Sequence, residues 1–105
     1  MKKDIPAHYQ KIKAQHPEYI AAVEALSETL KNTGPLDESL AQFLQLAASI
    51  AIKSEGATHS HTRQLVELGF SPDEIRHAVI LLSNTIGFPN VMAGLSWVND
   101  ILESE

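Results

Sequence analysis

Apolar residues recur at intervals of three and four positions along most of the chain, a period typical of amphipathic helices. One such face, in the segment that begins at 16–18, comprises Tyr19 or Ile20, Val23, Leu26 and Leu30. A wider face near the end of the chain comprises Val91, Leu95, Val98 and Leu102, together with Trp97 and Ile101. No stretch of four or more residues keeps apolar and polar positions alternating, so we expect no strands. The pattern predicts an all-α fold.

Proline, glycine and capping residues divide the chain into about six helices. The clearest start signal is Ser71-Pro72-Asp73-Glu74, in which Ser71 can cap the helix, Pro72 suits its first turn and Glu74 completes a capping box. We expect a break or a kink at Gly56. The expected helices cover Asp4 to Gln15, His16 to the stop signal at Asn32-Thr33-Gly34-Pro35, Asp37 to about Ser54, about Ala57 to Leu68, Ser71 to Ile86, and Pro89 to Leu102.

The length of 105 residues fits a single domain over residues 1–105, in which the first two helices form an N-terminal hairpin over 1–34. A chain of this size buries a modest core, and oligomerisation is a natural way to add stability. The wide apolar face of the last helix fits two arrangements equally well. The helix is either packed deeply in the core, or packed on the core with one edge and on another subunit with the other.

Composition removes several classes of function. The formal net charge is −5 and the eight lysines and arginines form no long basic run, so we expect no nucleic-acid partner. The absence of cysteine excludes disulfides, thiolate metal sites and thiol nucleophiles. No secretory signal is visible, and the longest apolar stretch, 46–52, is too short to span a bilayer. We therefore expect a cytoplasmic protein without a membrane partner.

The densest polar cluster runs from Lys53 to Arg63, where the third expected helix gives way to the fourth. In a helix that begins near Ala57, His61 shares a face with Leu65 and Leu68 and points inward. An inward imidazole can shuttle a proton, or it can be a structural histidine satisfied by a carbonyl or a hydroxyl. The spacing alone favours the structural role.

The second histidine of this cluster, His59, lies about 200° around the helix from His61, on a face that also carries Glu55. The two imidazoles can share a metal ion only if the segment is not helical, so we expect none here. Arg63 could hold a carboxylate, although a surface arginine usually has no specific role. Gln42, Gln45 and Ser49 form a polar stripe that either lines a pocket or faces solvent.

Four segments, in this order and spacing, resemble the carboxymuconolactone decarboxylase family, which includes the AhpD-like alkylhydroperoxidases. The resemblance covers about 36–102, the expected family core, and the carrying segments are Leu46-Ala47-Ala48-Ser49-Ile50-Ala51, His61-Thr62-Arg63, Ser71-Pro72-Asp73-Glu74-Ile75-Arg76 and Ile86-Gly87-Phe88-Pro89. It implies an AhpD-like all-α bundle that assembles as a ring-like homo-oligomer, a hexamer or a trimer.

The AhpD-like branch carries a Cys-x-x-Cys-x-x-x-His motif. Alignment of its histidine on His61 places the two cysteines at Ser54 and Ala57, and an upstream glutamate of that branch at Gln42. Three of the four redox positions are therefore replaced. A thiol peroxidase or disulfide reductase mechanism cannot run without a thiolate.

The decarboxylase branch also lacks these cysteines and keeps a histidine that corresponds to His61. The resemblance implies removal of a carboxylate from a muconolactone-type ring acid, followed by protonation of carbon, without a cofactor. On this hypothesis His61 is the acid–base residue and Glu55 a second one. Residues that would contact the substrate, a small organic acid, are Arg63, Ser54, His59 and Gln42. The alternatives are a non-catalytic oligomeric scaffold or small-molecule binder of the same fold, and a metal site at His59 and His61.

Overall fold

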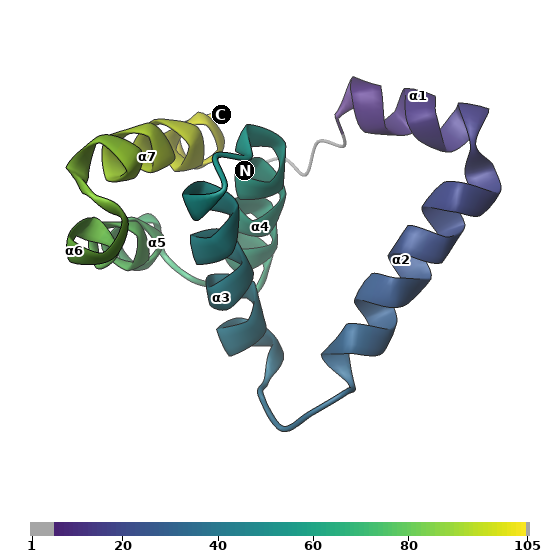
Figure 1. The fold of residues 1–105 in the computed structure, drawn as a ribbon, viewed down its shortest axis with the longest axis horizontal. Helices are drawn as coiled ribbons and strands as arrows, with labels where there is room; N and C mark the ends of the chain where they lie inside the picture. Colours follow the sequence, from purple (N-terminus) through teal and green to yellow (C-terminus); the bar gives the residue numbers. More distant parts are fainter. Residues whose placement is uncertain (1–5, 105) are drawn as a thin grey trace. The chain divides into compact units, whose positions relative to one another are not determined.

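The computed structural model describes residues 6–104, and within that range it is all-α, as predicted. It contains six helices of nine residues or more and one of a single turn, with no strand in the part described (Figure 1). The helices are α1 (Ala7–Gln15), α2 (Pro17–Lys31), α3 (Glu38–Ala51), α4 (Glu55–Glu67), α5 (Pro72–Ile80), α6 (Ser83–Ile86) and α7 (Phe88–Leu102). The expected start of the first helix at Asp4 lies outside the described residues.

The described residues fall into two compact units, with the boundary between Asp37 and Glu38. The first unit contains α1 and α2, which pack against each other. The hydroxyl of Tyr9 on α1 donates a hydrogen bond to the Glu24 carboxylate on α2, and Lys13 Nζ lies 3.2 Å from the same carboxylate. The hydrogen bond from Tyr9 lowers the pKa of Glu24. These polar contacts hold the two helices together.

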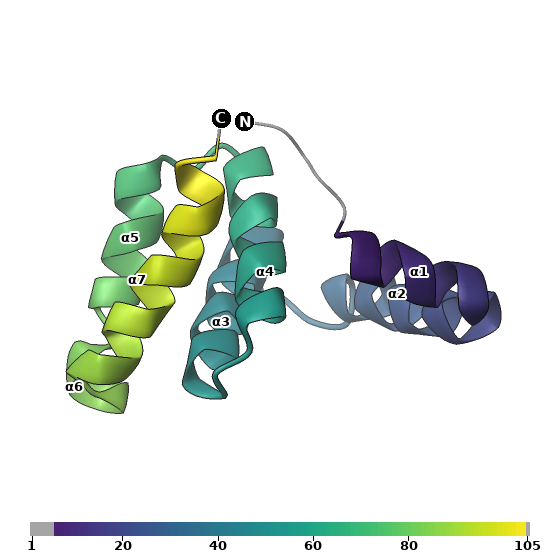
Figure 2. The same ribbon diagram turned by 90° about the horizontal axis from the view of Figure 1, so that it is seen from above.

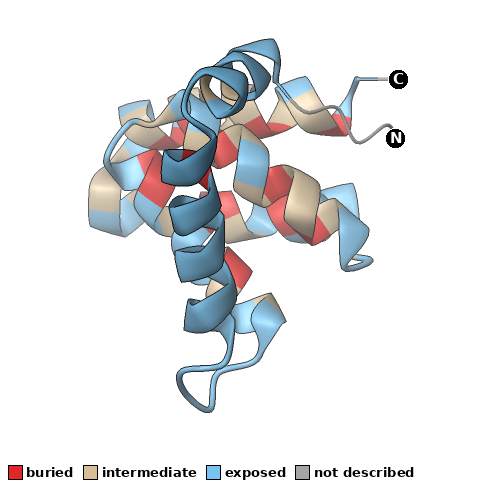
Figure 3. Ribbon diagram, turned by 90° about the vertical axis from the view of Figure 1, so that its right-hand side faces the viewer, coloured by how far each residue is buried: buried red, intermediate tan, exposed pale blue. Residues whose placement is uncertain are grey.

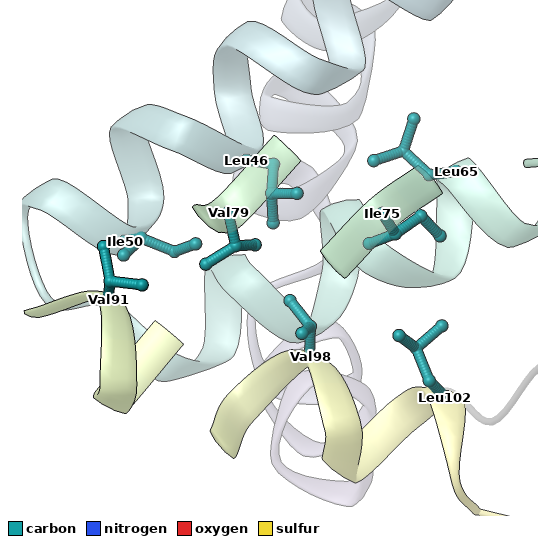
Figure 4. Packing of buried hydrophobic residues seen from close by; sticks show 8 residues of the cluster. All are labelled: Leu46, Ile50, Leu65, Ile75, Val79, Val91, Val98 and Leu102. Atoms are coloured by element: carbon teal, nitrogen blue, oxygen red, sulfur yellow. The ribbon is translucent and has the colours of Figure 1, made fainter. Parts of the chain in front are cut away.

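The second unit contains α3 to α7 and holds the hydrophobic core. Helix α3 packs on α4, and α7 packs on both α4 and α5 (Figure 2). Among the described residues, all buried hydrophobic side chains but one lie in this unit; the buried positions are red in Figure 3. Figure 4 shows the core cluster, which consists of Leu46, Ile50, Leu65, Ile75, Val79, Val91, Val98 and Leu102.

Helix α7 comes very close to α3 at Gly94. A Cβ atom built on Gly94 would lie 2.9 Å from Ile50 Cγ2 and 3.0 Å from Ile50 Cδ1. Non-bonded carbon atoms pack best about 3.5–4.0 Å apart. A side chain at position 94 would therefore force Ile50 to shift, and glycine allows the close packing of α7 on α3.

The expected break at Gly56 is wrong, because Gly56 lies inside the first turn of α4. The chain breaks a few residues earlier, at Lys53, which adopts a positive φ of 62°. The N–H of Ser54 bonds the carbonyl of Ser49 and that of Lys53 bonds the carbonyl of Ile50, both at the end of α3. Such a left-handed residue usually is glycine. Because a lysine takes this role here, the prediction from the sequence put the break at the nearest glycine, Gly56.

The fifth expected helix is not continuous to Ile86. Helix α5 ends at Ile80, and the separate single turn α6 begins at Ser83. The Ser83 hydroxyl donates a hydrogen bond of 2.8 Å to the carbonyl of Ile80, which the end of α5 leaves free. This break brings Leu82 and Ile86 against the core. No proline or glycine marks it in the sequence.

The two apolar faces predicted from the sequence have different outcomes. On α7, Val91, Val98 and Leu102 are buried, which confirms that this helix packs on the core. On α2 only Ile20 is buried, while the side chains of Tyr19, Val23, Leu26 and Leu30 are 41–64% exposed. None of the helices in residues 6–104 has the length and apolar character needed to cross a membrane.

Candidate functional site

The candidate site lies where α3 packs on α4, and the start of α4 positions it. Ser54 caps α4, since its hydroxyl accepts a hydrogen bond of 3.3 Å from the N–H of Ala57. Ser54, Ala57 and His61 then follow one another along one side of the helix, within an arc of about 60° at 100° per residue. The imidazole of His61 therefore stands on the side of α4 that begins at its cap.

A chain of hydrogen bonds connects His61 to α3 and back to α4. The Nδ1 atom of His61 lies 2.8 Å from the side-chain oxygen of Gln42, which is buried at 4% exposure. The side-chain nitrogen of Gln42 donates a hydrogen bond of 2.8 Å to the side-chain oxygen of Gln64. The nitrogen of Gln64 in turn donates to the hydroxyl of Ser60 at 3.4 Å. Each amide in the chain is therefore oriented by its neighbour.

The orientation of the Gln42 amide, with its oxygen toward the ring, assigns the tautomer of His61. An amide oxygen only accepts hydrogen bonds, so Nδ1 of His61 carries the proton that it donates to Gln42. Burial lowers the pKa of His61, which favours the neutral imidazole. In that form Nε2 holds a lone pair, and no hydrogen bond to Nε2 occurs within residues 6–104. The arrangement provides a neutral imidazole with a free basic nitrogen.

A second polar network lies buried between the same two helices. The hydroxyls of Ser49 and Thr58 are 3.1 Å apart, and both side chains are at most 3% exposed. They also donate to the carbonyls of Leu46 and Ser54, and the buried Thr62 hydroxyl donates to the carbonyl of Thr58. Buried hydroxyls cost little when they are hydrogen-bonded in this way. This network holds α3 against α4 beneath the candidate site.

The structure places Glu55 and His59 away from His61, in a cluster with Asp100 of α7. The Nε2 atom of His59 lies 2.9 Å from Asp100 Oδ2 and 3.9 Å from Glu55 Oε2. The side chain of His59 is 21% exposed, and those of the two carboxylates are more than half exposed. His59 thus contacts Glu55, with which it was expected to share a helix face, and also Asp100. The hydrogen bond of His61, by contrast, goes to Gln42.

The remaining predicted contact residues have different positions. Ser54 acts as the cap of α4, and Gln42 is the direct partner of His61. Arg63 lies two residues beyond His61, about 200° around the helix, and so on the side of α4 that carries His59. The structure therefore brings Gln42 and His61 together and separates them from Arg63, Glu55 and His59.

Sequence reasoning missed Gln64 and Asp100 and the buried hydroxyls. Gln64 is three residues after His61, so helical spacing alone could have placed it beside the histidine. Thr58 and Thr62 are four residues apart, so the same spacing could have placed them on one face of the helix. Asp100 has no local signal, since only the packing of α7 on α4 brings it to His59. Of the polar stripe on α3, Gln42 and Ser49 face the core, whereas Gln45 is exposed.

Comparison with known proteins supports the resemblance. Residues 17–100 match the family model described as Carboxymuconolactone decarboxylase family. No curated protein and no solved structure matches the chain. The matched range covers α2 to α6 completely and nearly all of α7, and it includes the hydrogen-bonded chain from His61 to Ser60.

Proposed function

This chain belongs to the carboxymuconolactone decarboxylase family, and we propose that it is a cofactor-free acid–base catalyst acting on a small organic acid. The reaction class is that of a lyase or an isomerase. His61 is the acid–base residue, and Gln42 and Gln64 hold it in position. A thiol mechanism is excluded by composition, since the chain has no cysteine.

The observation that carries this proposal is the half-buried imidazole of His61, hydrogen-bonded at Nδ1 to Gln42. A general base works best when its lone pair is available near neutral pH and its ring is fixed. The hydrogen bond from Nδ1 to Gln42 and the lowered pKa meet both conditions. The other ring nitrogen, Nε2, has no hydrogen-bond partner within residues 6–104 and so remains available.

The chemistry follows from the protonation state. Neutral Nε2 can remove a proton from a carbon next to a carbonyl group, and the imidazolium so formed can return that proton to another carbon. In a decarboxylation the electron pair of the broken carbon–carbon bond remains on the substrate as carbon dioxide leaves. Nε2, once it has taken up a proton from water or from another carbon of the substrate, delivers that proton to the carbon and returns to the neutral form. Carboxylate binding by Arg63 and a second acid–base role for Glu55 stay predictions, and each would need a substrate that reaches beyond the His61 side of α4.

Proton exchange at carbon tests this proposal across a whole class of candidate substrates at once. A panel of lactone and keto carboxylic acids, including carboxymuconolactone, is incubated with the protein in D₂O and followed by NMR for deuterium uptake and loss of carbon dioxide. We expect exchange or decarboxylation with the wild-type chain and its loss in His61→Gln. His77→Gln is the matched control, because His77 is exposed on α5. Equal rates for wild type and His61→Gln across the panel would contradict the proposal.

We further propose that the chain assembles as a homo-oligomer, a hexamer or a trimer. The exposed apolar side chains of α2 support this, because contiguous apolar surface marks association sites. Leu40 and Leu44 on α3 are also more than half exposed. Native mass spectrometry should show a trimer or hexamer for the wild type and a smaller species for Leu26→Glu. A wild-type monomer would contradict this part of the proposal.

The second candidate function is a non-catalytic scaffold or small-molecule binder. The same exposed apolar faces favour it, since a protein whose role is assembly needs such surfaces and no free base. The two functions differ in their dependence on His61. If the protein is a scaffold, the His61→Gln variant should assemble like the wild type, and neither of the two should show exchange activity.

A further inference from the structure

We infer that Glu55, His59 and Asp100 form a binding site for a first-row divalent metal ion such as Zn²⁺. This cluster lies on a different side of α4 from the imidazole of His61, which carries the proposed acid–base chemistry. It brings together one imidazole nitrogen and two carboxylates from two helices. Within residues 6–104 these three are the residues whose potential ligand atoms converge, all within 4.8 Å of one another.

The distances fit a metal site. Zinc–nitrogen and zinc–oxygen bonds of about 2.0–2.2 Å place neighbouring tetrahedral ligands about 3.3–3.5 Å apart. The observed separations from His59 Nε2 are 2.9 Å to Asp100 and 3.9 Å to Glu55, one on each side of that value. Binding of an ion requires Asp100 to move slightly away from His59 and Glu55 to move closer, and both carboxylate side chains are exposed enough to rotate.

The backbone that carries the three ligands is fixed by the core. Glu55 and His59 are one turn apart on α4, and His59 directly follows Thr58, which is completely buried. On α7, Asp100 lies between the buried residues Val98 and Leu102. Ligands on packed helices are held more accurately than ligands on loops. The site thus needs little reorganisation to bind an ion.

Charge and exposure also favour a divalent cation. With a neutral imidazole the cluster carries two negative charges, which a single doubly charged ion balances. Both carboxylates are more than half exposed, so an ion has access from solvent and water can complete its coordination. Imidazole together with carboxylates suits zinc, iron and nickel, whereas magnesium and calcium prefer oxygen ligands alone. Three protein ligands with an open position are typical of accessible metal sites rather than closed structural ones.

Direct titration with Zn²⁺ tests the inference. The full chain is treated with a chelator, dialysed and titrated with Zn²⁺ by calorimetry, and native mass spectrometry counts the ions bound per chain. We expect one Zn²⁺ per chain in the wild type. Loss of even an outer-shell partner of a metal weakens binding by about 10–100-fold, so His59→Gln and Asp100→Asn should weaken it at least that much. Excess Mg²⁺ should not compete.

Two further variants separate this site from other histidines. His77→Gln on α5 and His61→Gln on the other side of α4 should bind Zn²⁺ like the wild type. Circular dichroism then checks that all variants keep their helices. A wild type that binds no Zn²⁺ would overturn the inference, as would binding that survives both His59→Gln and Asp100→Asn. Binding that depends on His61 and not on His59 would also overturn it. In each of those cases the cluster is an ion pair that joins α4 to α7.

Discussion

The substitution Gln42→Glu is the sharpest test of how α3 controls His61. It exchanges an amide for a carboxylate of nearly the same shape, 2.8 Å from His61 Nδ1 at a buried position. A negative charge within about 4–6 Å stabilises a protonated imidazole and typically shifts its pKa by about 1–3 pH units. Each unit corresponds to about 1.4 kcal/mol of preference for the charged form. The low exposure of position 42 leaves little water to screen this interaction.

We therefore expect Gln42→Glu to reverse the effect of burial and raise the pKa of His61 above that of the wild-type chain. The glutamate and the histidine will titrate as a coupled pair, so the measured values belong to the pair. A protonated His61 cannot act as a base. Any exchange activity of the variant should then fall at neutral pH and recover at higher pH. Its pH–activity profile should shift upward by as many pH units as the pKa of His61 has risen.

The measurement is an NMR titration of the ring carbons and nitrogens of His61 across the pH range. Gln45→Glu is the matched control, because it places the same charge on α3 at an exposed position three residues away. If Gln42→Glu raises the pKa no more than Gln45→Glu does, the proposed coupling is refuted. The same spectra report the wild-type tautomer, and a proton on Nε2 instead of Nδ1 would refute the orientation assigned to Gln42.

Three further outcomes follow from the packing, the caps and the buried histidine. Gly94→Ala should lower the midpoint of urea unfolding, because overpacking costs about 1–3 kcal/mol and a helical alanine regains only about 1 kcal/mol. The same substitution in an Ile50→Ala background should cost no stability. A loss of stability that persists in that background would show that the contact with Ile50 is not its cause. Ser71→Ala should destabilise the chain by about 0.5–2 kcal/mol through loss of the α5 capping box, whereas Ser96→Ala at an exposed position of α7 should change stability little in the same urea assay. Because burial lowers the pKa of His61 from its ordinary 6.5, the unfolded chain binds more protons than the folded one as the pH falls through that value. The stabilising effect of neutral His61 is thus complete above about pH 6.5 and decreases below it. His61→Gln should therefore lose less stability between pH 7 and pH 5 than the wild type does. Thermal melts at the two pH values measure this difference.

The sequence predicted the helices well where local signals and packing agree. Ser71 and Glu74 form both hydrogen bonds of the expected capping box, since this motif is satisfied by residues three positions apart. The apolar face of α7 is also as expected, because the core determines its spacing. The signals failed where the backbone used an uncommon residue. Lys53 adopts a left-handed backbone conformation, which the sequence would have indicated only if the residue were glycine. The break after α5 is stabilised by one hydrogen bond from Ser83, which is not a recognisable stop signal.

The candidate site was predictable in part, for a similar reason. Helical spacing places His61 toward the core, and the alignment with the family singled out Gln42, but neither shows that the two side chains bond. That contact joins residues nineteen positions apart, and the distance depends on how α3 and α4 cross. The grouping of Asp100 with Glu55 and His59 depends on the packing of a third helix, α7. The exposed face of α2 looks from the sequence like a core face, because periodicity reports amphipathicity and not what covers it.

The cap of α4 has a consequence for how chemistry at this junction can change. Ser54, where the alignment on His61 predicts the first cysteine of the AhpD-like motif, starts the helix by accepting the N–H of Ala57. The capping oxygen of Ser54 thus occupies the place that a thiol would take, so a cysteine at this position would give up the hydroxyl cap. Ala57 leaves a small side chain one turn before His61, where a thiol would fit into the same line. At this junction a thiol at position 54 and a hydroxyl cap on α4 are therefore alternatives, whereas the side chain of Ala57 can change without loss of the cap, because Ala57 contributes only its backbone N–H.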